Sequence, residues 1–349
     1  MTGNPAGDQG NTENYRELPR TSSIGGDVQT YDSYQLLDAR VMELYREQNY
    51  AGALDLLTAE GPRYPGHETD VSYMRSCLAT RTGDYGLAVE ILEQTLEQGS
   101  WFGEMLLRRS PSWQPLQGLP DFERVAAACL ERQRAEQTGR PPAHYSALIP
   151  EGGTPPYRSI VALHGNGENP RNALDGWRAV TDEGWLLAAI ESSQIIRSDG
   201  YVWDDTEVAL REIREQYAAL AADHELSADH LVIAGFSMGG HTALRVALSG
   251  TIPARAFILL GPGGPDPDAD DPGSWLPLIK EARERGVQLR GYLLAGQDDD
   301  LTPVETQRRL AGFLTEHGVP CGFEAVPGVA HAYPLDFRPV IQRALAFIA

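Results

Sequence analysis

The 349-residue sequence has little lysine, little cysteine and no long apolar run. Lys280 is the only lysine, so arginine supplies the other positive side chains, and the formal net charge is −20. This negative balance argues against partners such as nucleic acid or anionic membrane surfaces, because both attract clusters of Lys and Arg. Two explanations of the acidic composition stay open: a composition bias with a solvated acidic surface, and an adaptation to salt.

The few cysteines also restrict the class of protein. Cys77, Cys129 and Cys321 are odd in number and far apart, and no Cys-x-x-Cys pair occurs. Neither a disulfide framework nor a thiolate metal site is therefore indicated. No run approaches the roughly 20 apolar residues of a membrane span. The polar N-terminus carries no apolar core of a signal peptide, so we expect a cytoplasmic protein.

The chain is long enough for two domains, and its hydrophobic fraction of 42% is sufficient for a packed core. Residues 1–30 are rich in Gly, Asn, Thr, Ser and Asp, which predicts a disordered arm. Apolar residues recur at helical spacing over residues 31–137, which predicts an all-α domain. Residues 145–349 form a second predicted domain. The segment "EQTGRPPAHY", which contains two prolines, is the linker between the two domains.

The predicted helical domain contains an internal repeat. Its segments "REQNYAGALDLLTAEGPRYP" and "RTGDYGLAVEILEQTLEQG" align at an offset of 85 − 50 = 35 residues, pairing Tyr50 with Tyr85, Ala53 with Ala88 and Leu57 with Leu92. Small alanines let two helices approach, and the period is close to the ~34 residues of tetratricopeptide repeats. This part resembles the tetratricopeptide family, with a degenerate third unit in "WFGEMLLRRSPSWQPLQGLPDFERV". A plain helical bundle that happens to repeat is the alternative.

From residue 145 onward, short apolar runs alternate with helical stretches, which predicts a mainly parallel sheet covered by helices on both faces. The expected strands lie in "YSALIP", "SIVALHG", "WLLAAIES", "LVIAGFS", "RAFILLGP", "LRGYLLAG" and "CGFEAVPG". The expected helices are Thr206–Asp223, Met238–Leu248, Leu276–Arg285 and Pro303–His317.

The segment "LVIAGFSMGGHTAL" places Ser237 between two glycines, where a strand is followed by a helix. This context matches the nucleophile elbow, a turn so tight that the neighbouring positions require glycine. The turn would raise the serine hydroxyl above the sheet and direct the N–H groups of the helix N-terminus toward it.

A second loop, "LHGNGEN", follows another strand of the predicted sheet. In a parallel sheet it would lie beside the elbow, so we expect the N–H groups of Asn166 and Met238 to form an oxyanion hole. His164 is a second candidate for catalysis, although a structural role in fixing this turn is the favoured interpretation.

Among eight histidines, His331 is the expected general base. It lies in the loop "VPGVAHAYPLDF" after the last strand, at the edge where sites of open α/β sheets gather. His241, one turn beyond the serine, is interpreted as a packed helix residue. An orienting acid is available in "GQDDDLTP", where only one of Asp298, Asp299 and Asp300 can point at the histidine.

The motifs "GFSMGG", "GQDDDLTP" and "PGVAHAY" give the chain order Ser, Asp, His. With these motifs and "LHGNGEN", residues 145–349 resemble the α/β-hydrolase superfamily. The loop "LHGNGEN" together with "VWDD" is similar to phospholipase/carboxylesterase-type and dienelactone-hydrolase-like enzymes. The family pattern Gly-x-x-Asp-x-x-x-Pro fits Gly296, Asp299 and Pro303, so the resemblance implies that Asp299 is the acid, with Asp298 in reserve.

The motifs predict a serine carboxylesterase-type hydrolase that acts on a small-molecule ester through an acyl-enzyme and requires no metal or cofactor. We expect Trp203 and Gly165 to line the substrate site, although Trp203 suits the core equally well. The acidic segment Gly261–Trp275 is either a rim of the site or a plain surface loop. The alternatives are a prolyl-oligopeptidase-type peptidase and an interaction protein whose helical part binds a partner or forms a homo-oligomer.

Overall fold

The computed structural model describes residues 31, 33–140, 142–264 and 271–349. The predicted arm 1–30 and residues 265–270 of the predicted rim (Gly261–Trp275) lie outside the described residues. Within the described ranges, no helix is both long and apolar enough to cross a membrane. The α-helices are α1 (Tyr34–Arg46), α2 (Tyr50–Glu60), α3 (Glu68–Thr82), α4 (Tyr85–Glu97), α5 (Glu104–Arg109), α6 (Pro120–Gly139), α7 (Pro170–Trp177), α8 (Thr206–Asp223), α9 (Met238–Ser249), α10 (Leu276–Glu284), α11 (Val304–Glu316) and α12 (Arg338–Ile348).

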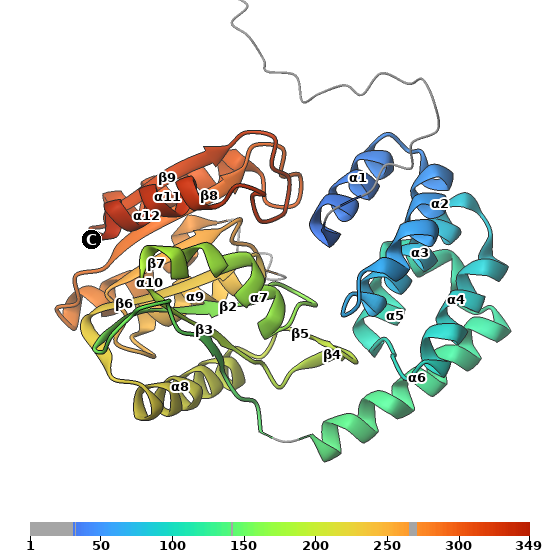
Figure 1. Ribbon diagram of the computed structural model, residues 1–349, viewed down its shortest axis with the longest axis horizontal. Coiled ribbons are helices and arrows are strands. Elements are labelled where there is room, and N and C mark those ends of the chain that lie inside the picture. Colours follow the sequence, from blue (N-terminus) through green and yellow to red (C-terminus); the bar gives the residue numbers. More distant parts are fainter. Residues whose placement is uncertain (1–30, 32, 141, 265–270) are drawn as a thin grey trace, which may run out of the picture.

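Helices α1 to α6 form an all-α part, residues 33–139, which we call the helical region (Figure 1). The side chains of Asn49 and Asp84 cap α2 and α4 at equivalent positions of the repeat. Ala53 and Ala88 are both 0% exposed. Their small side chains let each helix pack closely against the preceding one. The 35-residue offset therefore corresponds to two successive helical hairpins, α1–α2 and α3–α4.

The remaining chain forms a seven-stranded sheet in the order β1-β3-β2-β6-β7-β8-β9. All neighbouring strands are parallel except the edge pair β1 and β3. Its strands are β1 (Ser146–Leu148), β2 (Tyr157–Leu163), β3 (Leu186–Ile190), β6 (Leu226–Phe236), β7 (Ala256–Leu260), β8 (Arg290–Gly296) and β9 (Cys321–Val326). This arrangement, with helices between the parallel strands, is the predicted α/β-hydrolase fold.

Helices cover both faces of the sheet (Figure 1). In β2, Val161 and Leu163 join a core with α8, α9, α10 and α11, whereas Ile160 and Ala162 join a second core with α7 and α12. The alternation follows because successive side chains of a strand point to opposite faces. The helix bounds agree closely with the predicted ones, and α8 agrees at both ends.

A two-stranded hairpin, β4 (Ile195–Arg197) and β5 (Gly200–Tyr201), extends from the sheet toward the helical region (Figure 1). Ile195 and Tyr201 are buried in the same apolar cluster as Trp101, Phe102 and Trp113 of the helical region. The hairpin, called the β4–β5 arm below, therefore supplies part of that region's core. The arm is not among the elements predicted from the sequence.

Candidate active site

The chain reverses sharply at Ser237, between the end of β6 and the start of α9. Ser237 has φ 52° and ψ −123°, a conformation that costs a non-glycine residue energy and is held by its surroundings. A Cβ atom on Gly235 would lie 2.2 Å from the carbonyl oxygen of Gly239. The two glycines of the motif are thus required by close backbone approach.

Three side chains from separate loops meet beside this turn. The Nε2 atom of His331 lies 2.8 Å from the Oγ atom of Ser237, and its Nδ1 atom lies 2.8 Å from the Oδ2 atom of Asp299. Because an ionised carboxylate only accepts hydrogen bonds, Nδ1 of a neutral imidazole carries the proton and Nε2 is free to accept one from the serine. The three residues have the geometry of a nucleophile, a base and an orienting acid.

Asp299 is held by the loop that carries it. Its Oδ1 atom accepts hydrogen bonds from the backbone N–H groups of Leu301 (3.0 Å) and Thr302 (2.8 Å), and Oδ2 accepts one from the Thr302 hydroxyl (2.7 Å). Burial alone would raise the pKa of Asp299, but the hydrogen bonds from His331 and Thr302 outweigh it and lower that pKa. Asp298 is exposed, whereas Asp299 is buried, so the structure brings the first-choice aspartate to His331.

The loop His164–Asn169, called the HGNG loop below, lies against the elbow. A Cβ atom on Gly239 would lie 2.3 Å from the carbonyl oxygen of His164. His164 is 0% exposed, and its ring stacks on Trp203 with 4.7 Å between centroids. Burial lowers the pKa of His164 to about 4, which keeps the ring neutral near pH 7. These contacts favour the structural interpretation of His164.

Hydrogen bonds fix the peptide units on both sides of Gly165. Its N–H group donates to Oε2 of Glu168 (2.7 Å), while its carbonyl oxygen accepts from Nδ1 of His164 (2.9 Å) and from the Glu168 N–H group (3.2 Å). In a trans peptide the N–H group of the next residue points away from that carbonyl. The N–H group of Asn166 is therefore directed away from His164, and this orientation suits an oxyanion donor.

Met238 is the first residue of α9, so its N–H group has no acceptor within the helix. Its side chain reaches the HGNG-loop side of the elbow, where the backbone N–H group of Trp203 lies 3.3 Å from its Sδ atom. The position of Met238 is thus compatible with the predicted role of its N–H group beside Ser237.

The two predicted substrate contacts lie on the inner side of the loop. Trp203 is 4% exposed, and its Nε1–H group donates to the carbonyl oxygen of His164 (2.9 Å). Gly165 is buried, with Glu168 and Phe236 each 3.0 Å from the position of a Cβ atom. For Trp203 these contacts favour the core interpretation, while contact of either residue with substrate stays a prediction.

Two polar residues of the site, Thr302 and Glu168, were not predicted from the sequence. Thr302 binds Asp299 as described above. An aspartate whose side chain accepts hydrogen bonds from the N–H groups two and three residues later forms an Asx turn, and aspartate is a typical residue of such turns. Glu168 gave no such signal, because the fold alone buries its carboxylate. Burial raises the pKa of Glu168 to about 7, against the opposing effect of its bond from Gly165.

Comparisons with known proteins bear on both parts of the chain. Residues 33–137 match the family model described as the N-terminal domain of A/B hydrolase-like proteins. An uncharacterized protein from Bacillus cereus ATCC 10987 has 24% identity and a TM-score of 0.49, with 90% of this chain and 98% of that chain covered.

Two esterase structures match a smaller part of the chain. Esterase PE8 has 20% identity and a TM-score of 0.46, with 59% of this chain and 99% of that chain covered. A carboxylesterase from Mesorhizobium loti has 21% identity and a TM-score of 0.44, with coverage of 60% and 96%. The sheet topology shows an α/β-hydrolase fold, preceded by a helical region that matches the model of the A/B hydrolase-like N-terminal domain.

Proposed function

We propose that the protein is a serine hydrolase that cleaves carboxylic esters of small molecules through an acyl-enzyme. The observation that supports this most strongly is the pair of 2.8 Å contacts that His331 makes with Ser237 and Asp299. A positioned base next to a serine hydroxyl is what converts that weak nucleophile into a reactive one.

In the first step, Nε2 of His331 takes the proton from Ser237 as Oγ attacks the ester carbonyl carbon. The carbonyl oxygen becomes an oxyanion, which the N–H groups of Asn166 and Met238 stabilise. Asp299 holds the imidazole in its tautomer and stabilises the imidazolium. When the tetrahedral intermediate collapses, the imidazolium returns its proton to the leaving alkoxide, and the alcohol departs.

In the second step, His331 takes a proton from water as that water attacks the acyl carbon. The second tetrahedral intermediate expels Ser237 Oγ, which recovers its proton from His331, and the carboxylic acid is released. The free enzyme is regenerated with all protons accounted for. All groups invoked belong to the chain and water.

Labelling with a fluorophosphonate probe tests this proposal. The expected result is covalent modification of Ser237, found by peptide mass spectrometry and absent from Ser237→Ala. A folded wild-type protein that is not modified would favour the interaction-protein alternative. Parallel assays with p-nitrophenyl esters and aminoacyl-arylamides separate an esterase from a peptidase, and we expect hydrolysis of the esters only.

We further propose that the chain divides into a helical domain of residues 31–137 and a catalytic domain of residues 145–349. The end of α6 at Gly139 and the start of β1 at Ser146 support this division. The two hairpins with a 35-residue offset support a tetratricopeptide-like domain, which offers a surface for a partner or a second copy. A cytoplasmic location completes the proposal.

A further inference from the structure

We propose that the helical region positions the HGNG loop, and that Arg197 of the β4–β5 arm is the positioning residue that links the two. This inference rests on the proposed function, because it assigns the N–H group of Asn166 to the oxyanion. It gives the helical region a part in the chemical step rather than a role as a cover or a separate binding module.

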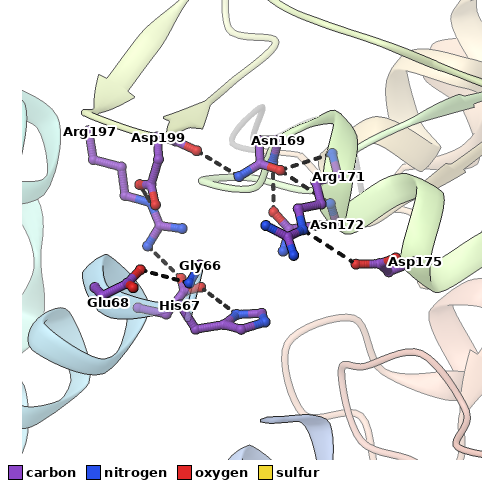
Figure 2. Close-up of polar contacts among 10 residues, drawn as sticks. Gly66, His67, Glu68, Asn169, Arg171, Asn172, Asp175, Arg197 and Asp199 are labelled. Carbon is purple, nitrogen blue, oxygen red and sulfur yellow. Dashed lines mark hydrogen bonds and ion pairs between the residues drawn. The ribbon is translucent and has the colours of Figure 1, made fainter. Parts of the chain in front are cut away.

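The link begins at an ion pair between the helical region and the arm. The NH1 atom of Arg197 lies 2.6 Å from Oδ1 of Asp70, in the first turn of α3. The Nε atom of Arg197 lies 3.2 Å from Oδ1 of Asp199 (Figure 2). Arg197 is only 6% exposed, so water screens this pair far less than a surface pair. Although burial would raise the pKa of Asp70, Arg197 and His67 lower it, which keeps the carboxylate ionised.

The arm is also held by backbone contacts with the helical region. The N–H group of Gly103 donates to the carbonyl oxygen of Ile196 (2.7 Å), and the N–H group of Ser198 donates to the backbone carbonyl oxygen of Trp101 (3.1 Å). Together with the buried side chains of Ile195 and Tyr201, these bonds hold the arm against the helical region.

The other side of the arm pairs with the HGNG loop. The Gly167 N–H group donates to the Tyr201 carbonyl oxygen, and the Tyr201 N–H group donates to the Glu168 carbonyl oxygen, both at 2.9 Å. The side-chain Nδ2–H of Asn169 donates to the backbone carbonyl oxygen of Asp199 at 2.9 Å (Figure 2). Residues 167–169 are thus bonded directly to the arm that Arg197 anchors.

This connection matters because an oxyanion donor must lie about 2.7–3.1 Å from the developing charge. Displacement of a catalytic group by about 1 Å can cost on the order of 100-fold in rate. Loosening of the arm should therefore lower kcat, since the oxyanion bond strengthens in the transition state, and should leave KM nearly unchanged.

Asp70→Ala removes the partner of Arg197, and Asn169→Asp tests the far end of the link. Aspartate at position 169 retains the oxygen that caps α7 but loses the N–H group that binds Asp199. Asp70→Asn keeps an acceptor for Arg197 and is the conservative variant. Glu93→Ala is the matched control, because it removes the carboxylate partner of Arg124 in an exposed pair of the same region.

The measurements are kcat and KM for p-nitrophenyl acetate, the affinity of a trifluoromethyl ketone and the thermal unfolding curve. The ketone adds to Ser237 as an anionic hemiketal, so its affinity reports on the oxyanion hole. We expect Asp70→Ala and Asn169→Asp to lower kcat and ketone affinity by roughly 10- to 100-fold, with KM within about twofold of wild type. Asp70→Asn should recover part of this loss, and Glu93→Ala should match wild type.

Wild-type kcat and ketone affinity in a folded Asp70→Ala or Asn169→Asp protein overturns the inference. A rise in KM with unchanged ketone affinity does so as well, because it would indicate a role in substrate entry. If Asp70→Ala does not fold, Asn169→Asp decides alone. Ser237→Ala in the same assay tests the proposed function separately: its loss of turnover combined with unaffected arm variants refutes only the positioning role.

Discussion

Gly239 and His164 approach so closely that a Cβ atom on the glycine would lie 2.3 Å from the carbonyl oxygen of the histidine. The elbow and the HGNG loop are therefore in backbone contact, and the position of one sets the position of the other. This contact holds the N-terminus of α9 against the HGNG loop, as the proposed oxyanion hole requires.

Gly239→Ala should therefore impair both stability and turnover. The added methyl group meets backbone atoms, so the loop must shift, and overpacking of this kind costs about 1–3 kcal/mol of unfolding free energy. Denaturant unfolding and kcat on p-nitrophenyl acetate measure the two effects. Gly312→Ala is the control, because a Cβ atom there meets nothing within 4 Å and the change favours helix α11 by up to about 1 kcal/mol. Wild-type kcat in Gly239→Ala would contradict the proposed coupling.

The assignment of the triad acid predicts different effects at adjacent positions. Asp299→Asn should lower kcat by about 10⁴-fold, because the amide cannot hold the imidazole in the required tautomer. Asp298→Asn should have nearly wild-type kcat, since that side chain is exposed. Steady-state kinetics of both variants decides, and a reversed order would make Asp298 the acid.

The elements and the motif residues were predictable from the sequence because their signals are local. A buried parallel strand is a short apolar run, and the elbow requires glycines beside Ser237 whatever the rest of the chain does. The order Ser, Asp, His could likewise be inferred, since each residue follows the end of an expected strand at the edge where sites form. The helical repeat was visible because Ala53 and Ala88 must both be small.

The residues that hold the site together were not predictable in the same way. Arg197 and Asp70 are 127 positions apart (197 − 70) and carry no motif, so only the folded arm brings them together. The carboxylate of Glu168 acquires its environment from three-dimensional packing. The β4–β5 arm was missed because its strands are three and two residues long, too short for a periodic pattern.

Asp38 on α1 has a raised pKa. Burial and the neighbouring Asp70 raise its pKa to about 6, against the opposing effects of His67 and Arg46. The folded protein therefore binds this proton more tightly than the unfolded chain, whose value is 3.8, and ionisation destabilises the fold as pH rises from about 4 to 6.

Asp38→Asn should thus raise the unfolding temperature at pH 7.5 and have little effect at pH 4. Thermal unfolding at both pH values measures the difference. Asp55→Asn on the exposed side of α2 is the control, and it should change the unfolding temperature little because that side chain is exposed. An equal change at both pH values would mean that the proton on Asp38 is not responsible.

Two measurements distinguish a core role of Trp203 from contact with the acyl group of the substrate. Trp203→Phe leaves the carbonyl oxygen of His164 without its donor, which should cost about 1–3 kcal/mol of stability. Trp275→Phe is a matched control: Trp275 is 2% exposed, and its Nε1 atom has no hydrogen-bond partner in the part of the chain that the structure describes. We expect the greater loss at Trp203, with an unchanged ratio of kcat/KM for acetate and butyrate esters. A shifted ratio would instead place Trp203 in the acyl pocket.

The proposed function depends on Ser237 being the nucleophile of an ester hydrolase, activated by His331 and Asp299. The most direct test is kcat of purified, folded Ser237→Ala with p-nitrophenyl acetate beside wild type. We expect turnover by the wild type and a loss on the order of 10⁴-fold or more in the variant. Equal turnover by the two proteins would contradict it.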